Sequence, residues 1–282
     1  MNILLSGSNG LIGSALKTSL ENEGHNVTRL SRNFDDPINF EGINAVIHLA
    51  GENIAQGRWT DAKKSEIKKS RLNGTKKLSE QLAASSHKPS IFISSSATGF
   101  YGDKEDIILD ENSSQGSGFL PEVCVEWEKS TFAAEQAGIR TVHIRTGIVL
   151  SKKGGALKKM LPPFKFGGGG ILGSGNQYMS WISLEDEINA IIFILNNSSL
   201  SGPINLTAPH PVNNKEFTKI LGKVLKRPTI LPLPGFIARF LFGEMADAIL
   251  LTGNRVLPNK LIEAGFTFTH SKLDEALKDI IN

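Results

Sequence analysis

The sequence predicts an α/β protein: a Rossmann-type, doubly wound parallel sheet followed by a smaller C-terminal domain. Short apolar segments alternate with helical segments along residues 1–206, and residues 2–24 have the pattern of a strand, a glycine turn and a helix. Residues 207–282 are punctuated by prolines and have mainly helical patterns. We therefore expect two domains, 1–206 and 207–282.

The composition excludes several classes of partner. The 282 residues are 40% hydrophobic, and 31 basic against 28 acidic residues leave a net charge of +3, too little to favour nucleic acid or an anionic membrane. The lysines of residues 61–77 are typical of a solvated helix face, because no aromatic residues are interleaved for base stacking. The longest apolar run, residues 190–195, is too short to span a bilayer. We expect a soluble protein with no nucleic-acid and no membrane partner.

Cysteine and histidine usage indicates the compartment and argues against a metal. Cys124 is the only cysteine, so no intramolecular disulfide can form and a reducing, cytoplasmic compartment is the default. The first ten residues lack a basic leader and a signal-peptide apolar stretch. The six histidines show no metal-ligand spacing, so we expect no metal site.

A glycine-rich turn near the N-terminus predicts a nucleotide site, a purely structural turn being the alternative. Gly7, Gly10 and Gly13 stand between an apolar segment and a helical segment that ends at Gly24. Such turns need glycine for tightness, for close approach of the backbone to a pyrophosphate, and for helix–strand packing. The amides that begin the helix then hold the phosphates. The predicted contacts are Gly7, Asn9, Gly10, Leu11, Ile12 and Gly13.

The end of the second predicted strand, Asn26–Leu30, predicts which nucleotide binds. An NAD site usually carries an acidic residue here for the ribose 2′-hydroxyl. This sequence has Ser31 and Arg32 instead, a hydroxyl and a bidentate cation that suit a 2′-phosphate. We therefore predict NADP(H) as the cofactor, the alternative being that Arg32 is a surface cation.

Further strands bring small and polar residues to the same edge of the sheet. The third predicted strand, Ala45–Leu49, runs into "HLAGEN", and the fourth, Ser90–Ser94, into a row of serines. A helix around Pro121–Ala137 and a strand at Thr141–Thr146 continue the alternation. Open parallel sheets bind ligands at the carboxyl ends of their strands. Cofactor contacts are therefore predicted at Leu49, Ala50, Gly51, Glu52 and Ser94.

Several motifs together resemble one known superfamily. "GSNGLIG", "VIHLAG" and "ISSSATGFYGD" resemble the extended short-chain dehydrogenases/reductases, which include nucleotide-sugar epimerases and dehydratases. More narrowly, "GENIAQGRWT", "SRLNGT", "VCVEWE", "RTGIVLSKKGGAL", "GSGNQYMSWIS" and "NRVLPNKLIEAGFTF" resemble epimerase-family proteins with a C-terminal domain of unknown function. The resemblance implies NADP(H) binding, a substrate-side C-terminal domain, an unidentified small-molecule substrate and a possible homodimer. It also implies that Arg71, in "SRLNGT", contacts the cofactor.

The proton-transferring pair of that superfamily is missing. Its members use a tyrosine followed four residues later by a lysine, whose charge lowers the tyrosine pKa. At that spacing Glu105 follows Tyr101, and Ile182 follows Tyr178. Two functions therefore stay open. One is an NADP(H)-dependent oxidoreductase or epimerase-like enzyme, and the other is a non-catalytic NADP(H)-binding sensor or interaction protein.

Other residues are candidates for the remaining chemistry. Ser95 and Ser96 close the fourth strand beside the expected nicotinamide, where a hydroxyl can bond a substrate carbonyl or, as the alternative, the turn backbone. Glu128, or Glu122 on the same helix, is a candidate acid–base group if burial raises its pKa. Arg145 ends an apolar strand, where a buried ion pair and a ligand role are both open.

Further candidate residues lie in the predicted helix around Pro121–Ala137 and in the glycine-rich segment 164–183. Leu120 and Cys124 stand roughly where relatives carry the tyrosine and lysine, and we expect Cys124 and Trp127 to pack in the core. The glycine-rich composition of residues 164–183 predicts either a mobile lid or a surface loop. Secondary candidates for lining the pocket are Gln177, Trp181 and Asp186.

Overall fold

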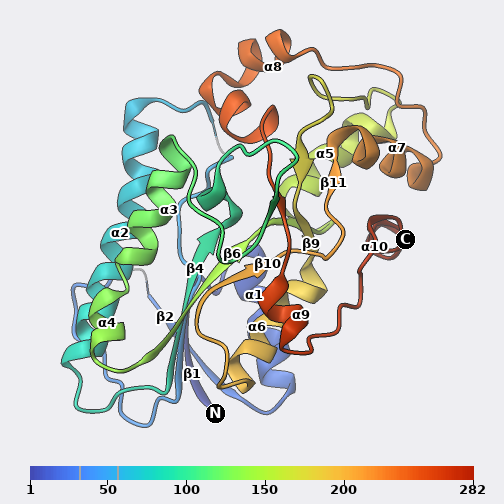
Figure 1. The fold of residues 1–282 in the computed structure, drawn as a ribbon. Helices are drawn as coiled ribbons and strands as arrows, with labels where there is room; N and C mark the ends of the chain where they lie inside the picture. The colour runs from blue at the N-terminus through green and yellow to red at the C-terminus, as the bar shows by residue number, and fades with distance from the viewer. Residues whose placement is uncertain (32, 56) are drawn as a thin grey trace.

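A six-stranded parallel sheet forms the centre of the computed structural model, which describes residues 1–31, 33–55 and 57–282 (Figure 1). The strands are β1 (Asn2–Ser6), β2 (Asn26–Leu30), β3 (Ala45–His48), β4 (Ile91–Ala97), β6 (Arg140–Thr146) and β10 (Gly202–Leu206). They stand in the order β10-β6-β4-β3-β1-β2, and every neighbouring pair is parallel. The order reverses at β1, which opens a crevice at the carboxyl ends of β1 and β3. The predicted doubly wound parallel sheet is confirmed.

Helices cover both faces of this sheet (Figure 1). On one face lie α1 (Leu11–Asn22) and α6 (Leu184–Asn196), which contact each other. On the other face lie α2 (Asp61–Ala84), α3 (Phe119–Lys129) and α4 (Phe132–Gln136). The sheet is therefore buried on both sides, which explains why its strands are nearly continuous apolar runs.

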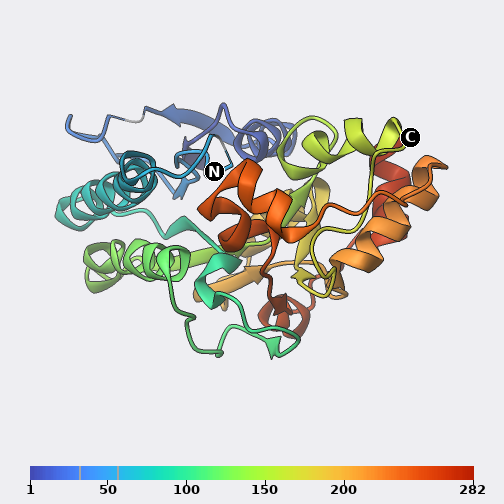
Figure 2. The same ribbon diagram turned by 90° about the horizontal axis from the view of Figure 1, so that it is seen from above.

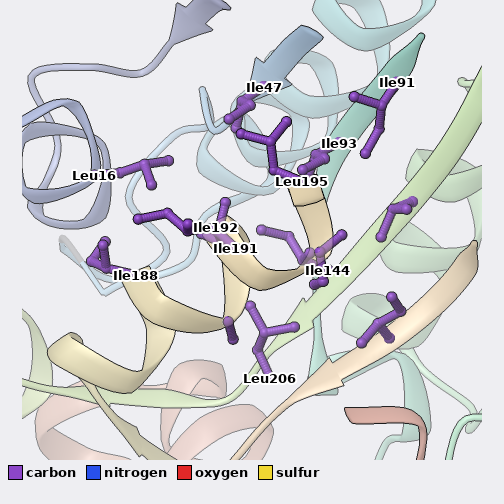
Figure 3. Packing of buried hydrophobic residues seen from close by; sticks show 14 of the residues in the cluster. Leu16, Ile47, Ile91, Ile93, Ile144, Ile188, Ile191, Ile192, Leu195 and Leu206 are labelled. Atoms are coloured by element: carbon purple, nitrogen blue, oxygen red, sulfur yellow. The ribbon is translucent and has the colours of Figure 1, made fainter. Parts of the chain in front are cut away.

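The helix α6 packs its apolar residues against one face of the sheet. Ile188, Ile191 and Leu195 recur at helical spacing and are at most 5% exposed. They lie in one cluster with Ile93 of β4 and Ile144 of β6 (Figure 3). Each buried side chain of this size contributes about 1.5–3 kcal/mol, so this contact fixes α6 beneath the carboxyl ends of β4 and β6.

Two predicted elements have different limits in the structure. The single helix expected at Pro121–Ala137 is wrong: α3 and α4 are separate, because the Thr131 hydroxyl donates to the Glu128 carbonyl at 2.7 Å and competes with the helical pattern. The strand expected at Ser90–Ser94 continues to Ala97, because β4 pairs with β6 along its whole length. The serine row is therefore part of the sheet rather than of a turn.

The remaining elements lie mostly beyond the carboxyl ends of the sheet. They are η1 (Thr98–Tyr101), β5 (Ile108–Leu109), β7 (Ile148–Leu150), α5 (Gly155–Lys165), β8 (Tyr178–Met179), β9 (Trp181–Ser183), β11 (Val212–Asn213), α7 (Asn214–Leu225), α8 (Gly235–Phe242), the π-helix η2 (Ala246–Leu250), β12 (Arg255–Val256), α9 (Asn259–Glu263) and α10 (Leu273–Ile281). The short pairs β12·β5 and β11·β8 join the last third of the chain to earlier segments. Figure 2 shows α8 and η2, in orange, lying over this end of the sheet.

The glycine-rich segment expected to be a lid or a loop is tied to the C-terminal part of the chain. The Gly173 amide donates to the Leu233 carbonyl and the Leu233 amide donates to the Ile171 carbonyl, both at 2.9 Å. A Cβ on Gly170 would lie 1.8 Å from the Leu231 carbonyl oxygen, so only glycine allows this approach. Among the helices of the described residues, none combines the length and the apolar character that crossing a bilayer requires.

Candidate functional site

The glycine turn between β1 and α1 is shaped by close backbone contacts. Gly7 has a φ of 72°, and a Cβ there would lie 2.6 Å from the backbone carbon of Leu49. A Cβ on Gly13 would lie 2.3 Å from the Gly7 carbonyl oxygen. Gly10 caps α1, so the amides of the first helical turn point out of the turn. Only glycine at both Gly7 and Gly13 leaves this backbone open to a ligand.

A cavity of about 390 Å³, here called the glycine-turn cavity, lies against this turn. Its lining includes the predicted cofactor contacts Gly7, Gly10, Leu11, Ile12, Gly13 and Leu49. Asn9, also predicted, is exposed and is not part of that lining. Backbone amides at a helix N-terminus hold phosphates well, so the turn fits the pyrophosphate of a dinucleotide.

A smaller cavity of about 270 Å³, here called the loop cavity, lies beside the segment that follows β3. Three predicted residues line it, namely Ala50, Gly51 and Glu52. Lys69 and Lys77 of α2 line it as well, although the sequence predicts that residues 61–77 form a solvated helix face. The position of the loop cavity, beside the segment that follows β3, suits the adenosine end of a nucleotide bound at the glycine turn.

Of the two residues predicted to select a 2′-phosphate, Ser31 lines neither of these cavities. Ser31 is exposed, and its hydroxyl donates to the Asn33 carbonyl at 3.2 Å. Arg32 lies outside the described residues. Two other cationic side chains, those of Lys69 and Lys77, line the loop cavity, and Lys77 forms an ion pair with Asp35.

A larger cavity of about 570 Å³, here called the large cavity, opens from the glycine-turn cavity. The two share a wall made of Ile12, Ile54, Ser95, Gly147, Ile148 and Ile249. The shared wall contains both glycine-turn and η2 residues, so the last third of the chain closes over the crevice. A ligand that follows the glycine turn therefore reaches the large cavity.

The neighbouring serines at the end of β4 have different roles. Ser96 donates its hydroxyl to Glu128 at 2.7 Å. Ser95 lines both cavities, and among the described residues its hydroxyl has no hydrogen-bond partner. Ser94 is buried, and its hydroxyl also has no partner within the described structure. Ser95 is thus the serine of the three whose hydroxyl is available to a ligand in the cavity.

Glu128 belongs to a buried ion pair instead of lining a cavity. Arg145 donates to Glu128 through Nε and Nη2, both at 2.8 Å, and the two side chains are 4% and 12% exposed. Burial acts to lower the pKa of Arg145, but the hydrogen bonds and charge of Glu128 outweigh burial and raise it. Of the two roles open for Arg145, the structure shows the ion pair. Glu128 orients Ser96 and Arg145 and has no contact with the cavity.

Tyr101, the tyrosine of the serine-row motif, lies in the same network. Its hydroxyl donates to Asn205 Oδ1 at 2.7 Å and accepts from Arg145 Nη1 at 3.0 Å. The residue is fully buried, and burial raises its pKa. A phenol so placed cannot reach a ligand in the large cavity, which it does not line. Tyr178, the other tyrosine, lines the cavity beneath the guanidinium of Arg255, 5.0 Å from its ring.

The α3 wall of the large cavity has an apolar character. Leu120 and Cys124, which are expected to stand roughly where the superfamily carries its tyrosine and lysine, both line it. Burial, with a smaller contribution from the Glu128 charge, raises the pKa of Cys124 to about 12, so its thiol stays neutral. Trp127 is 5% exposed and donates its indole N–H to Thr75 at 2.9 Å. The expected core packing of Cys124 and Trp127 is confirmed, although both also touch the cavity.

The secondary candidates hold the chain together rather than facing a ligand. The Asp186 carboxylate accepts from the Thr269 and His270 amides at 2.7 and 2.9 Å. Gln177 donates to the Leu172 and Leu250 carbonyls, and the Trp181 ring is fully buried. None of these three side chains lines one of the three cavities among the described residues.

Glu187 of α6 is a buried carboxyl group that the sequence reasoning missed. It accepts from the hydroxyl of Thr146, which lines the large cavity, at 2.8 Å. Its other oxygen has no partner within the described structure, and burial raises its pKa to about 8. Only the three consecutive acidic residues at the start of α6 hint at it in the sequence, and those are equally typical of an exposed helix N-terminus.

A doubly wound sheet with a glycine turn at its reversal point defines a dinucleotide-binding protein. The model of the NAD dependent epimerase/dehydratase family matches residues 3–206, and the chain belongs to that family. A second model, of a domain of unknown function (DUF1731), matches residues 233–280. Both matches confirm the resemblance seen in the sequence motifs.

Relatives and solved structures extend this result over the whole chain. An epimerase family protein of Mycobacterium tuberculosis is 45% identical, over 98% of this chain and 96% of its own length. The crystal structure of human epimerase family protein SDR39U1 (isoform 2) with NADPH has a TM-score of 0.94 at 30% identity, covering 99% of each chain. The crystal structure of a nucleoside-diphosphate sugar epimerase from Corynebacterium glutamicum has a TM-score of 0.80 at 35% identity, covering all of this chain and 58% of the other.

Removing the Glu128 carboxylate should destabilise the protein strongly. Glu128→Gln leaves the buried Arg145 charge without a counterion, and losing one partner of a buried pair costs about 3–5 kcal/mol. The double variant Glu128→Gln/Arg145→Met should recover part of the loss. Urea unfolding measures both, with Glu126→Gln as control: Glu126 pairs with Lys68 at the surface, and its loss should cost at most about 1 kcal/mol. Equal effects of Glu126→Gln and Glu128→Gln would contradict this account.

Glu187 should make the protein less stable as pH rises. Its pKa of about 8 in the folded protein exceeds the ordinary value of 4.5, so the folded state retains a proton that the unfolded chain loses. Between those two values the free energy of unfolding should fall by up to about 1.4 kcal/mol per pH unit, and above pH 8 the loss is complete. Glu187→Gln should remove this slope. Urea midpoints at pH 6, 7 and 8 test it, with the exposed Glu185→Gln as a control that keeps the slope.

Proposed function

We propose that this protein is an NADP(H)-dependent oxidoreductase of the epimerase/dehydratase family that acts on a small carbonyl compound. The observation that carries the proposal is the wall shared by the glycine-turn cavity and the large cavity, with Ser95 in it. A nucleotide held by the turn would direct its reactive end to a second, larger cavity that can hold a substrate. Bound NADPH would supply a hydride there.

The protein's own residues do three things in this proposal. The amides after Gly10 hold phosphates, and the loop cavity holds the adenosine end. The Ser95 hydroxyl donates to the oxygen of a substrate carbonyl. The apolar α3 wall and η2 exclude water, which strengthens that hydrogen bond.

The preference for NADP(H) over NAD is supported by cationic residues and by the absence of an acidic residue at the end of β2. Ser31 and Arg32 follow β2, and Lys69 and Lys77 line the loop cavity. Cations at this end suit the additional 2′-phosphate. The human relative whose structure contains NADPH has the same fold over its whole length.

A second function, that of a non-catalytic NADP(H) sensor, is favoured by one observation. The sequence contains no tyrosine followed four residues later by a lysine, and Tyr101 is buried in the Arg145 network. The large cavity favours an enzyme instead, because it offers a second pocket of about 570 Å³ that is continuous with the nucleotide site.

Nucleotide preference is the first test. NADPH should bind at least tenfold more tightly than NADH, a difference of about 1.4 kcal/mol, because the 2′-phosphate gains charge-assisted contacts. Arg32→Ala should reduce that preference, whereas Arg227→Ala, whose Nε donates to the Lys165 carbonyl away from the cavities, should not. A fluorescence titration of each variant with both nucleotides measures this. Equal binding of NADPH and NADH to the wild-type protein would contradict the preference.

Catalysis is tested by NADPH oxidation with a panel of aldehydes and ketones. Ser95→Ala should lower kcat/KM at least about tenfold while leaving the Kd for NADPH unchanged, because only the bond to the substrate oxygen is lost. Ser96→Ala is the matched variant, and its main effect should be on the unfolding midpoint, since Ser96 bonds Glu128. NADPH binding without oxidation by any carbonyl compound would favour the sensor.

A further inference from the structure

We propose that the large cavity binds a mainly apolar carbonyl compound that is uncharged or cationic, and that it does not bind a nucleoside diphosphate sugar. The inference rests on the proposed function, because it names the substrate class of that same cavity. Three features of the lining carry it: apolar walls, a single cationic side chain, and carboxylates at the exposed end.

The walls of the large cavity are largely hydrophobic. Phe119, Leu120 and Trp127 come from α3, and Ile249 comes from η2. Ile54 lies on the wall shared with the glycine-turn cavity. Ligand pockets with such walls bind apolar groups and use a few polar side chains for orientation. A sugar hydroxyl that packs against these apolar side chains would lose its hydrogen bond to water without gaining a partner.

Arg71 is the one cationic side chain in the described lining of the large cavity. Two of its N–H groups are already used, by the Ile67 and Glu52 carbonyls at 3.2 and 3.0 Å, and its guanidinium lies 5.1 Å from the Trp127 ring. A diphosphate is usually held by several cations or by helix amides. Among the described residues Arg71 is therefore the only side-chain cation that the lining offers to an anionic group, and part of its hydrogen-bonding capacity is already used.

The exposed end of the large cavity carries three carboxylates, from Asp103, Glu244 and Asp247. With Arg71 they give the described lining a formal charge of +1 − 3 = −2. Glu244 pairs with Lys64 at 3.0 Å and Asp247 with Arg239 at 2.9 Å, but neither cation lines the cavity. Asp103 has no ion pair among the described residues, so an ammonium group would find a charge-complementary partner here and a phosphate would meet an acceptor instead of a donor.

A matched set of ketones tests the proposal without relying on turnover. Acetophenone, 4-(aminomethyl)acetophenone and 4-acetylbenzoate share one skeleton and differ in charge, and UDP-glucose represents the nucleotide sugars. Binding to the full chain is followed by tryptophan fluorescence, because Trp127 lines the large cavity. We expect the cationic ketone to bind at least about tenfold more tightly than 4-acetylbenzoate, with acetophenone between them and no saturable binding of UDP-glucose.

Variants link the order of affinities to the named carboxylates. Asp103→Asn/Glu244→Gln/Asp247→Asn should reduce the tenfold difference to less than about threefold. The control Glu41→Gln/Glu185→Gln/Glu275→Gln removes three exposed carboxylates outside the cavity lining and should leave the difference unchanged. A circular dichroism spectrum of each variant shows that it is folded.

Several results would overturn the proposal. These are saturable binding of UDP-glucose, tighter binding of 4-acetylbenzoate than of the other two ketones, equal affinities for all three, or no binding of the neutral and cationic ketones. All are measured on the protein without nucleotide. Their outcome is therefore separate from the NADPH titration, whose failure would strike the proposed function itself.

Discussion

The buried ion pair between Glu128 and Arg145 is the interaction on which most of the site depends. Removing both charges from water is costly, and the bidentate contact offsets this cost only because further hydrogen bonds satisfy the remaining atoms. Those bonds come from Ser96 on β4 and Tyr101 on η1, and Tyr101 in turn reaches Asn205 on β10. The pair therefore fixes α3, and with it one wall of the large cavity, relative to three strands.

The alternation of side chains along β4 and β6 divides the roles of neighbouring residues. Successive residues of a strand point to opposite faces of a sheet. Ser96 and Arg145, which are directly opposite in register, face α3 and form the ion-pair network. Thr146, one residue later, faces α6 and bonds Glu187. Ser95 alternates with Ser96 in the same way, so a structural hydroxyl and an available hydroxyl stand side by side in the sequence.

This alternation explains which features of the fold and of the site could be predicted from the sequence and which could not. Local patterns were sufficient for the sheet and for the glycine turn, because the steric need of Gly13 arises from Gly7 and the glycine spacing itself is visible in the sequence, although the need of Gly7 comes from the distant Leu49. The serine row was recognised, but Ser95 and Ser96 could not be told apart, since their partners lie on elements distant in sequence. Glu187 was missed for the same reason: its partner Thr146 is 41 residues away, and the burial that raises its pKa, partly offset by the Thr146 hydrogen bond, comes from the tertiary packing.

Enclosure by the last third of the chain turns an open crevice into a selective site. Asn254 donates to the Thr98 carbonyl at 2.8 Å, which ties the segment after η2 to the end of the serine strand. Arg58 donates to the Phe240 and Leu241 carbonyls, which ties the end of α8 to the segment before α2. These contacts place residues of the last third of the chain, among them Glu244, Asp247 and Ile249, in the lining of the large cavity. The side chains that distinguish this cavity from an open crevice therefore come from a segment distant in sequence from the glycine turn.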